Sequence, residues 1–122
     1  MSQPQPQRVN ADDTDMDESE RVLYQGEPFT GEVVETDEDG VVIRLNNYLD
    51  GKEEGAQREW FNDGMLRSEY HATGGLPTGE SREWHENGRL ARRQEFDQYG
   101  HLRVREDWDE HGVADGEPMN TW

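Results

Sequence analysis

The sequence contains no cysteine, a single lysine and no long apolar run, and each absence excludes a class of protein. Without cysteine there is no disulfide, thiolate zinc site, iron–sulfur cluster or cysteine nucleophile, which fits a reducing compartment. No run of about 18 apolar residues occurs, and residues 1–20 hold no apolar segment that could serve as a signal-peptide core. We therefore expect a soluble, cytoplasmic protein.

Positive charge is also scarce, because 12 basic residues stand against 29 acidic ones and the formal net charge is −17. Lys52 is the only lysine, and the arginines are scattered, so no basic cluster offsets this balance. Such a chain is repelled by nucleic-acid phosphates and by anionic lipid headgroups. The composition therefore predicts neither a nucleic-acid partner nor a membrane partner. The length of 122 residues allows one domain at most.

Apolar residues make up only 30% of the chain, so disorder has to be considered. Residues 1–21 combine alternating Gln and Pro with acidic residues and few apolar side chains, which is typical of a disordered tail. We predict a disordered acidic tail over residues 1–21 and a folded repeat domain over residues 22–119. Residues 120–122 form the C-terminal end in this division.

The folded region shows an internal repeat with a period of 24 residues. Turn-like pairs of Asp, Asn or His with Gly recur at this interval, and their glycines are Gly40, Gly64, Gly88 and Gly112. A tryptophan column keeps the same interval at Trp60, Trp84 and Trp108. Four units follow, and they begin near Tyr24, Tyr48, Ala72 and Phe96. A fixed period of this size predicts a solenoid or an array.

Each unit has the pattern of a β-hairpin, because two short segments without helical spacing flank the Gly turn. A three-residue loop would place Trp60 opposite Leu66, whereas a two-residue loop would set Trp60 against Arg67. The first choice brings the apolar columns together, so we predict type I turns whose glycine adopts the left-handed conformation and forms a bulge. The predicted structural ladder consists of Trp60, Leu66, Trp84, Leu90 and Trp108. The fold class is all-β: an antiparallel β-meander of about four hairpin repeats in one elongated sheet.

The segments Gly55-Ala-Gln-Arg-Glu-Trp-Phe-Asn-Asp-Gly-Met-Leu and Gly79-Glu-Ser-Arg-Glu-Trp-His-Glu-Asn-Gly-Arg-Leu resemble the variant MORN repeat of the bacterial YwqK-type antitoxin family. The resemblance covers about residues 22–113. It implies a MORN-like sheet and a role in protein interaction, since such repeats occur in antitoxins and immunity proteins. Related MORN repeats serve as scaffolds and membrane-associated modules. The first unit has Thr36 in place of the tryptophan, and the fourth is degenerate.

The sequence offers no constellation for catalysis, for a cofactor or for a metal ion. The four histidines lack the spacing of metal ligands, and His85 and His111 flank predicted turns. The acidic clusters do not match a calcium-binding loop. No serine lies in a nucleophile elbow, and the glycines recur at the positions of hairpin turns and do not form a phosphate-binding loop. We therefore expect a protein that is not an enzyme.

The expected function is a non-catalytic binding module, an antitoxin or immunity-type protein that neutralises a basic toxin. The alternative is a structural or scaffold repeat protein that binds another cytoplasmic partner and is acidic only for solubility. The candidate contacts are Glu59, Glu83 and Asp107, which stand one position before each tryptophan and so on the opposite face, with Phe61 as aromatic anchor. The other interpretation of these acids is a solvated face that only keeps the chain soluble. The other interpretation of the tryptophan column, besides an exposed strip for a partner, is core packing.

Overall fold

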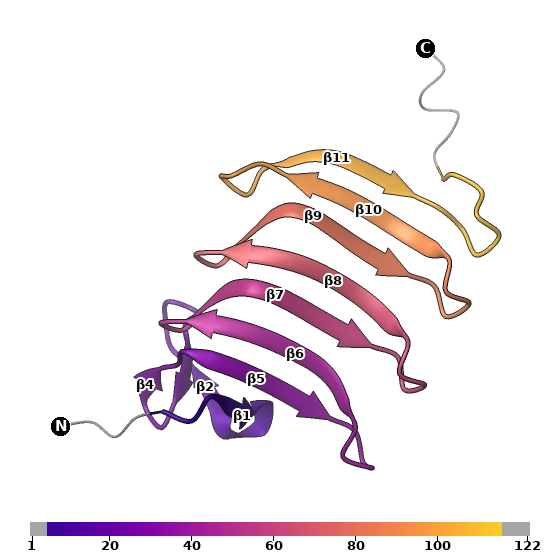
Figure 1. The fold of residues 1–122 in the computed structure, drawn as a ribbon. Helices are drawn as coiled ribbons and strands as arrows, with labels where there is room; N and C mark the ends of the chain where they lie inside the picture. Colours follow the sequence, from indigo (N-terminus) through magenta and orange to yellow (C-terminus); the bar gives the residue numbers. More distant parts are fainter. Residues whose placement is uncertain (1–4, 116–122) are drawn as a thin grey trace.

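The computed structural model describes residues 5–115, which form one elongated sheet with a small second sheet at its N-terminal end (Figure 1). The main sheet has the order β1-β5-β6-β7-β8-β9-β10-β11. Its strands are β1 (Arg8–Asn10), β5 (Gly31–Thr36), β6 (Val42–Leu49), β7 (Lys52–Trp60), β8 (Leu66–Thr73), β9 (Leu76–Trp84), β10 (Leu90–Phe96) and β11 (Leu102–Asp107). The small sheet contains β2 (Thr14–Met16), β3 (Val22–Tyr24) and β4 (Glu27–Pro28).

The described chain is all-β, as predicted, and its one helical element is the 3-10 turn η1 (Ala11–Asp13). Within residues 5–115, no helix is long and apolar enough to cross a membrane. Strands β5 to β11 pair consecutively and antiparallel, which gives the predicted meander. The main sheet as a whole is nevertheless mixed, because β1 pairs in parallel with β5.

The main sheet has eight strands because β1 joins the seven strands of the meander, and not because a fourth hairpin supplies a second strand. After β11 the chain turns back, but the described residues show only a single bridge, between Trp108 and Ala114. Ala114 stands where the earlier hairpins have Leu66 and Leu90, and its small side chain offers little surface for cross-strand packing.

The predicted disordered tail is not confirmed, because β1, η1 and β2 all lie within residues 1–21. Val9 of β1 is only 6% exposed and packs with Val22, Phe29 and Val33 in the apolar core of the protein. A prediction from composition averages over the whole segment, so it does not detect that a single buried valine packs an otherwise polar segment against the core. Strand β2 pairs with β3, so the small sheet contains residues from both sides of position 22. Residues 1–4 and 116–122, which include the last part of the predicted repeat domain and the predicted C-terminal end, lie outside the described residues.

The hairpin loops have the predicted length and register. The Gly64 amide donates to the Phe61 carbonyl at 2.9 Å, the Phe61 amide donates to the Met65 carbonyl at 2.8 Å, and Gly64 has a φ of 91°. Positive φ recurs at Gly40, Gly88 and Gly112. Cross-strand pairs join Trp60 to Leu66 and Trp84 to Leu90. The three-residue loop is thereby confirmed.

A β-bulge follows each of the first three turns and decides which side chains share a face. Glu59 and Trp60 are consecutive, but their partners Ser68 and Leu66 are two residues apart, so the extra residue, Arg67, lies in β8. Strand β7 therefore keeps its alternation, and Glu59 and Trp60 point to opposite faces. Equivalent extra residues are Ile43 in β6 and Ala91 in β10.

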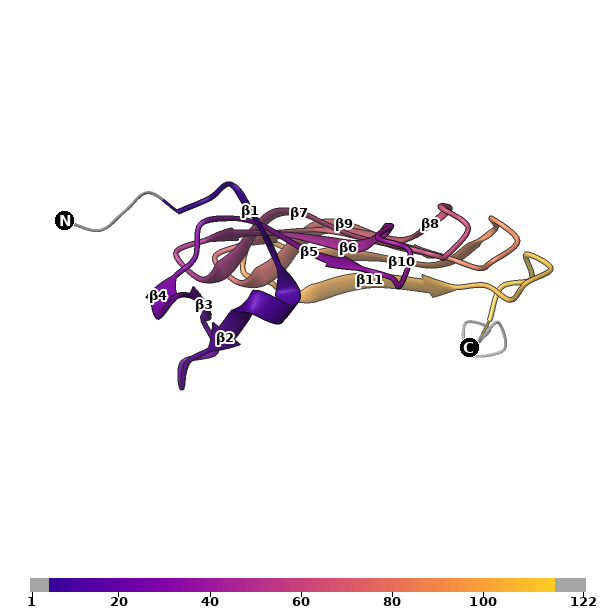
Figure 2. The ribbon, with the colours of Figure 1, turned by 90° about the horizontal axis from the view of Figure 1, so that it is seen from below.

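The two faces of the main sheet differ in what covers them. We call the inner face the one that carries a row of residues paired across β5 to β8, namely Val33, Asn46, Gln57 and Tyr70. Val33 belongs to the apolar core with Val22 and Phe29, so the small sheet packs against the inner face at this end. Seen from below, the small sheet lies to one side of a single-layered main sheet (Figure 2). Most of the inner face is therefore left open beyond the small sheet.

Candidate functional site

A continuous row of mostly charged residues crosses the inner face over seven strands. We call it the charged row, and its members, paired directly in this order, are Glu35, Arg44, Glu59, Ser68, Glu83, Arg92 and Asp107. Directly opposed residues of antiparallel strands project from the same face. The structure thus brings the predicted contacts Glu59, Glu83 and Asp107 into one line.

Two arginines, which the sequence analysis did not place beside these acids, interrupt the charged row. Arg44 lies 3.1 Å from Glu59, and Arg92 lies 3.3 Å from Glu83 and 2.7 Å from Asp107. The hydrogen bond from Arg92, supported by one from Arg105, holds the pKa of the Asp107 carboxyl below its ordinary value.

The negative charge of the charged row is smaller than the acid column alone suggested. It contains four carboxylates and two guanidiniums, and so retains two net negative charges. The signal for the arginines was present in the sequence, because Arg44, Ser68 and Arg92 form their own column at 24-residue spacing.

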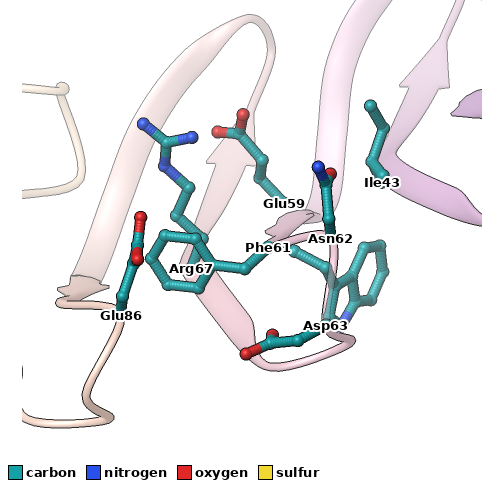
Figure 3. Close-up of a pocket in the computed structure, with 8 residues that line it drawn as sticks. Ile43, Glu59, Phe61, Asn62, Asp63, Arg67 and Glu86 are labelled. Carbon is teal, nitrogen blue, oxygen red and sulfur yellow. The ribbon is translucent and has the colours of Figure 1, made fainter. Parts of the chain in front are cut away.

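Phe61 and Glu59 border the same shallow hollow at the turn end of β7, whose volume is about 440 Å³. Figure 3 shows Glu59, Phe61 and Arg67 gathered there with Glu86 from the next turn. The Arg67 guanidinium carbon lies 5.4 Å from the centroid of the Phe61 ring, which is a cation–π distance. Glu83 does not line this hollow, so only Glu59 of the three predicted acids lies beside the predicted anchor.

The turn that carries Phe61 lacks the aspartate cap of the first and last hairpin turns, and so does the next turn, which begins at His85. In the turns at Asp37 and Asp109, the carboxylate of the first residue accepts hydrogen bonds from two backbone amides. Phe61 occupies the same position 24 residues after Asp37 and cannot accept them. Asp63 takes over part of this role by accepting from the Met65 amide at 2.9 Å. The two central turns share this arrangement, because Asn87 accepts from the Arg89 amide at 3.0 Å in the turn that begins at His85.

A second hollow on the inner face, of about 370 Å³, was not predicted from the sequence. Its walls include Tyr48, Tyr70 and Glu53, and the Tyr70 hydroxyl donates to the Glu53 carboxylate at 2.6 Å. Burial, followed by this hydrogen bond, raises the pKa of Tyr70 well above its ordinary value. The available signal was a departure from the repeat, since the equivalents of Tyr70 in the adjacent units are Asn46 and Gln94.

Comparison of the chain with protein-family models, with curated proteins and with solved structures gave no match. Over residues 5–115, no group of three or more His, Asp or Glu side chains is placed to hold a metal ion. The fold and inner face define a class: a single-layered β-hairpin sheet with a polar, ion-paired face and shallow hollows. Function is therefore inferred from the geometry of that face.

Proposed function

We propose that this chain is a non-catalytic protein-binding module whose inner face contacts a basic surface of a partner protein. The observation that carries the proposal is the charged row, which places Glu59, Glu83 and Asp107 in register and retains two net negative charges. Long-range attraction of this sign speeds the encounter with a basic partner. Phe61, beside Glu59, is the aromatic anchor, because a desolvated ring contributes much of the affinity of an interface.

We propose further that the partner is a toxin and that the protein acts in the bacterial cytoplasm as an antitoxin or immunity-type protein. The support is the resemblance to the YwqK-type variant MORN repeat together with the net charge of −17. A toxin that degrades nucleic acid needs a basic cleft, and an acidic sheet laid over that cleft would block the path of the phosphates. A partner without toxicity would favour a MORN-type scaffold instead.

The test removes the charge of the three acids without adding like charges beside Arg44 and Arg92. The variant carries Glu59→Gln, Glu83→Gln and Asp107→Asn. A matched control carries three exposed turn acids changed in the same way, and these changes are Glu38→Gln, Asp39→Asn and Glu110→Gln. Both variants alter the net charge equally, so a difference between them reports position on the inner face.

The measurement is retention of a basic protein by tagged parent, variant and control from cells of the source, followed by association kinetics with that protein. At about 50 mM salt, we expect association of the variant to be roughly threefold to tenfold slower than that of the control, with a shallower salt dependence. Co-expression should show that the parent relieves the toxicity of the partner. Equal association of variant and control would contradict the proposed interface, and a harmless partner would contradict the antitoxin role.

A further inference from the structure

The hollow of about 370 Å³ adjoins the charged row, since Arg44 and Glu59 belong to both. The other lining residues are Tyr48, Tyr70, Asn46, Gln57, Ser68, Arg58 and Glu53. Glu53 lies directly opposite Tyr48 in the register of β6 and β7, so both project from the inner face. The hollow thus places one carboxylate between two tyrosines.

Glu53 differs from the other charged residues of this hollow in having no ion-pair partner among residues 5–115. Glu59 is paired with Arg44 at 3.1 Å, and Arg58 is paired with Glu69 at 2.8 Å. The Glu53 carboxylate instead accepts one hydrogen bond at Oε1 from the Tyr70 hydroxyl. A carboxylate can accept several hydrogen bonds, so its second oxygen is available to a ligand. The lining as a whole holds two arginines and two glutamates, so the negative charge open to a ligand is that of Glu53 alone.

The floor of the hollow is fixed by the side-chain amide of Gln57, which is 1% exposed. Its Oε1 accepts from Asn46 Nδ2 at 2.7 Å and from the Asn47 amide at 3.1 Å, and its Nε2 donates to the Asn47 carbonyl at 2.9 Å. A fully bonded amide of this kind restrains the surrounding strands. A site formed by side chains that are already held in place loses less conformational entropy on binding.

We propose that this hollow receives the guanidinium or ammonium group of a basic side chain, with the Glu53 carboxylate as counter-ion and Tyr48 and Tyr70 as aromatic walls. The aromatic faces attract a cation and cover its aliphatic stem. An arginine can donate two parallel hydrogen bonds to the carboxylate, so arginine fits better than lysine. That the side chain belongs to a partner protein rests on the function proposed above, whereas the cation site itself does not.

The experiment titrates the full chain with N-acetyl-arginine amide and, in parallel, with the neutral isostere N-acetyl-citrulline amide. Amide signals in nitrogen–proton correlation spectra report binding, and we expect saturable shifts centred on Glu53, Gln57 and Tyr70 with the arginine probe only. Glu53→Gln should weaken arginine binding by about fivefold or more, since it removes the counter-ion. The matched control Glu38→Gln changes the net charge equally in an exposed turn and should stay within about twofold of the parent.

Equal affinity for arginine and citrulline, unchanged arginine affinity in Glu53→Gln, or no shift with either probe would each overturn the cation site. Should Glu53→Gln fail to fold, the parent decides, because arginine-dependent shifts centred away from Glu53, Gln57 and Tyr70 would overturn it as well. No partner protein is needed in this titration. If arginine binds at Glu53 but the charged-row variant associates with the partner as fast as its control, only the proposed function is refuted. If the charged-row variant is slower but arginine does not bind at Glu53, only the cation site is refuted.

Discussion

The two ends of the main sheet are held together by different means. At the N-terminal end, β1, β5 and the small sheet enclose Val9, Val22, Phe29 and Val33, and Phe29 is 0% exposed. At the C-terminal end, β9, β10 and β11 contain no fully buried residue. Their side chains form cross-strand ion pairs, such as the contacts of Arg93 with Glu80, Glu95 and Glu106. A conventional core therefore exists at one end only.

This difference explains how a chain with 30% hydrophobic residues folds. Apolar burial is the dominant favourable contribution to folding, and here it is concentrated where β1 and β5 meet the small sheet. From there the meander continues by backbone pairing, tight turns and ion pairs, each of which contributes little by itself. The N-terminal end should therefore control the stability of the whole, and the following experiments test that asymmetry.

The largest effect is expected from removing the ring at the centre of the apolar core. Phe29→Ala deletes a fully buried ring that also stacks edge-on with Tyr24 at a centroid distance of 5.9 Å. We expect the free energy of unfolding to fall by about 3–5 kcal/mol, measured by urea denaturation with tryptophan fluorescence. The matched control at the other end is Tyr99→Ala, because Tyr99 is 65% exposed and should cost about 0.5 kcal/mol or less. Similar costs for both variants would contradict the asymmetry.

A smaller but clear effect is expected from deleting residues 1–16. The deletion removes β1, η1 and β2 and exposes the surface of Val33 that Val9 covers. We expect the melting temperature to fall by about 4 °C or more, which corresponds to about 1 kcal/mol for a domain of this size. The single change Val9→Ala should reproduce part of the loss. An unchanged melting temperature would show that this segment is the dispensable tail that its composition suggests.

The sequence predicted the parts of the fold that recur and missed the parts that occur once. The three-residue loop at Gly64 and the pairing of Trp60 with Leu66 followed from a 24-residue column, because a repeated turn imposes one register on every unit. The parallel pairing of β1 could not be found in this way, since it occurs once in the chain and joins Arg8–Asn10 to a strand that is distant in sequence.

In the candidate site, too, the alignment of repeated residues was predictable from the sequence, and the contacts between neighbouring strands were not. The alignment of Glu59, Glu83 and Asp107 followed from their common spacing, and the register of the strands places them in one row. Their arginine partners and the hollow at Glu53 depend on cross-strand neighbours and on the buried amide of Gln57. A repeat shows which positions are equivalent, but it does not show which side chains on neighbouring strands meet.

The smallest expected effect concerns acid, and it tests the carboxylates that cap turns at the C-terminal end. Hydrogen bonds from the amides of Val113 and His111 hold the pKa of Asp109 below its ordinary value. The pKa of Asp97 is lowered in the same way, mainly by a hydrogen bond from the amide of His101. A carboxyl whose pKa is lower in the folded state stabilises the fold above its unfolded pKa of about 3.9, and this stability is lost as the pH falls through the folded pKa. The urea midpoint of Asp109→Ala should therefore lie below that of the parent near pH 7, and the gap should close toward about pH 3.

Asp39→Ala is the control, because no hydrogen bond to the Asp39 carboxylate occurs among residues 5–115, and its difference from the parent should not depend on pH in this way. A gap for Asp109→Ala that persists at low pH would show that this turn is stabilised by its backbone geometry and not by the ionised cap.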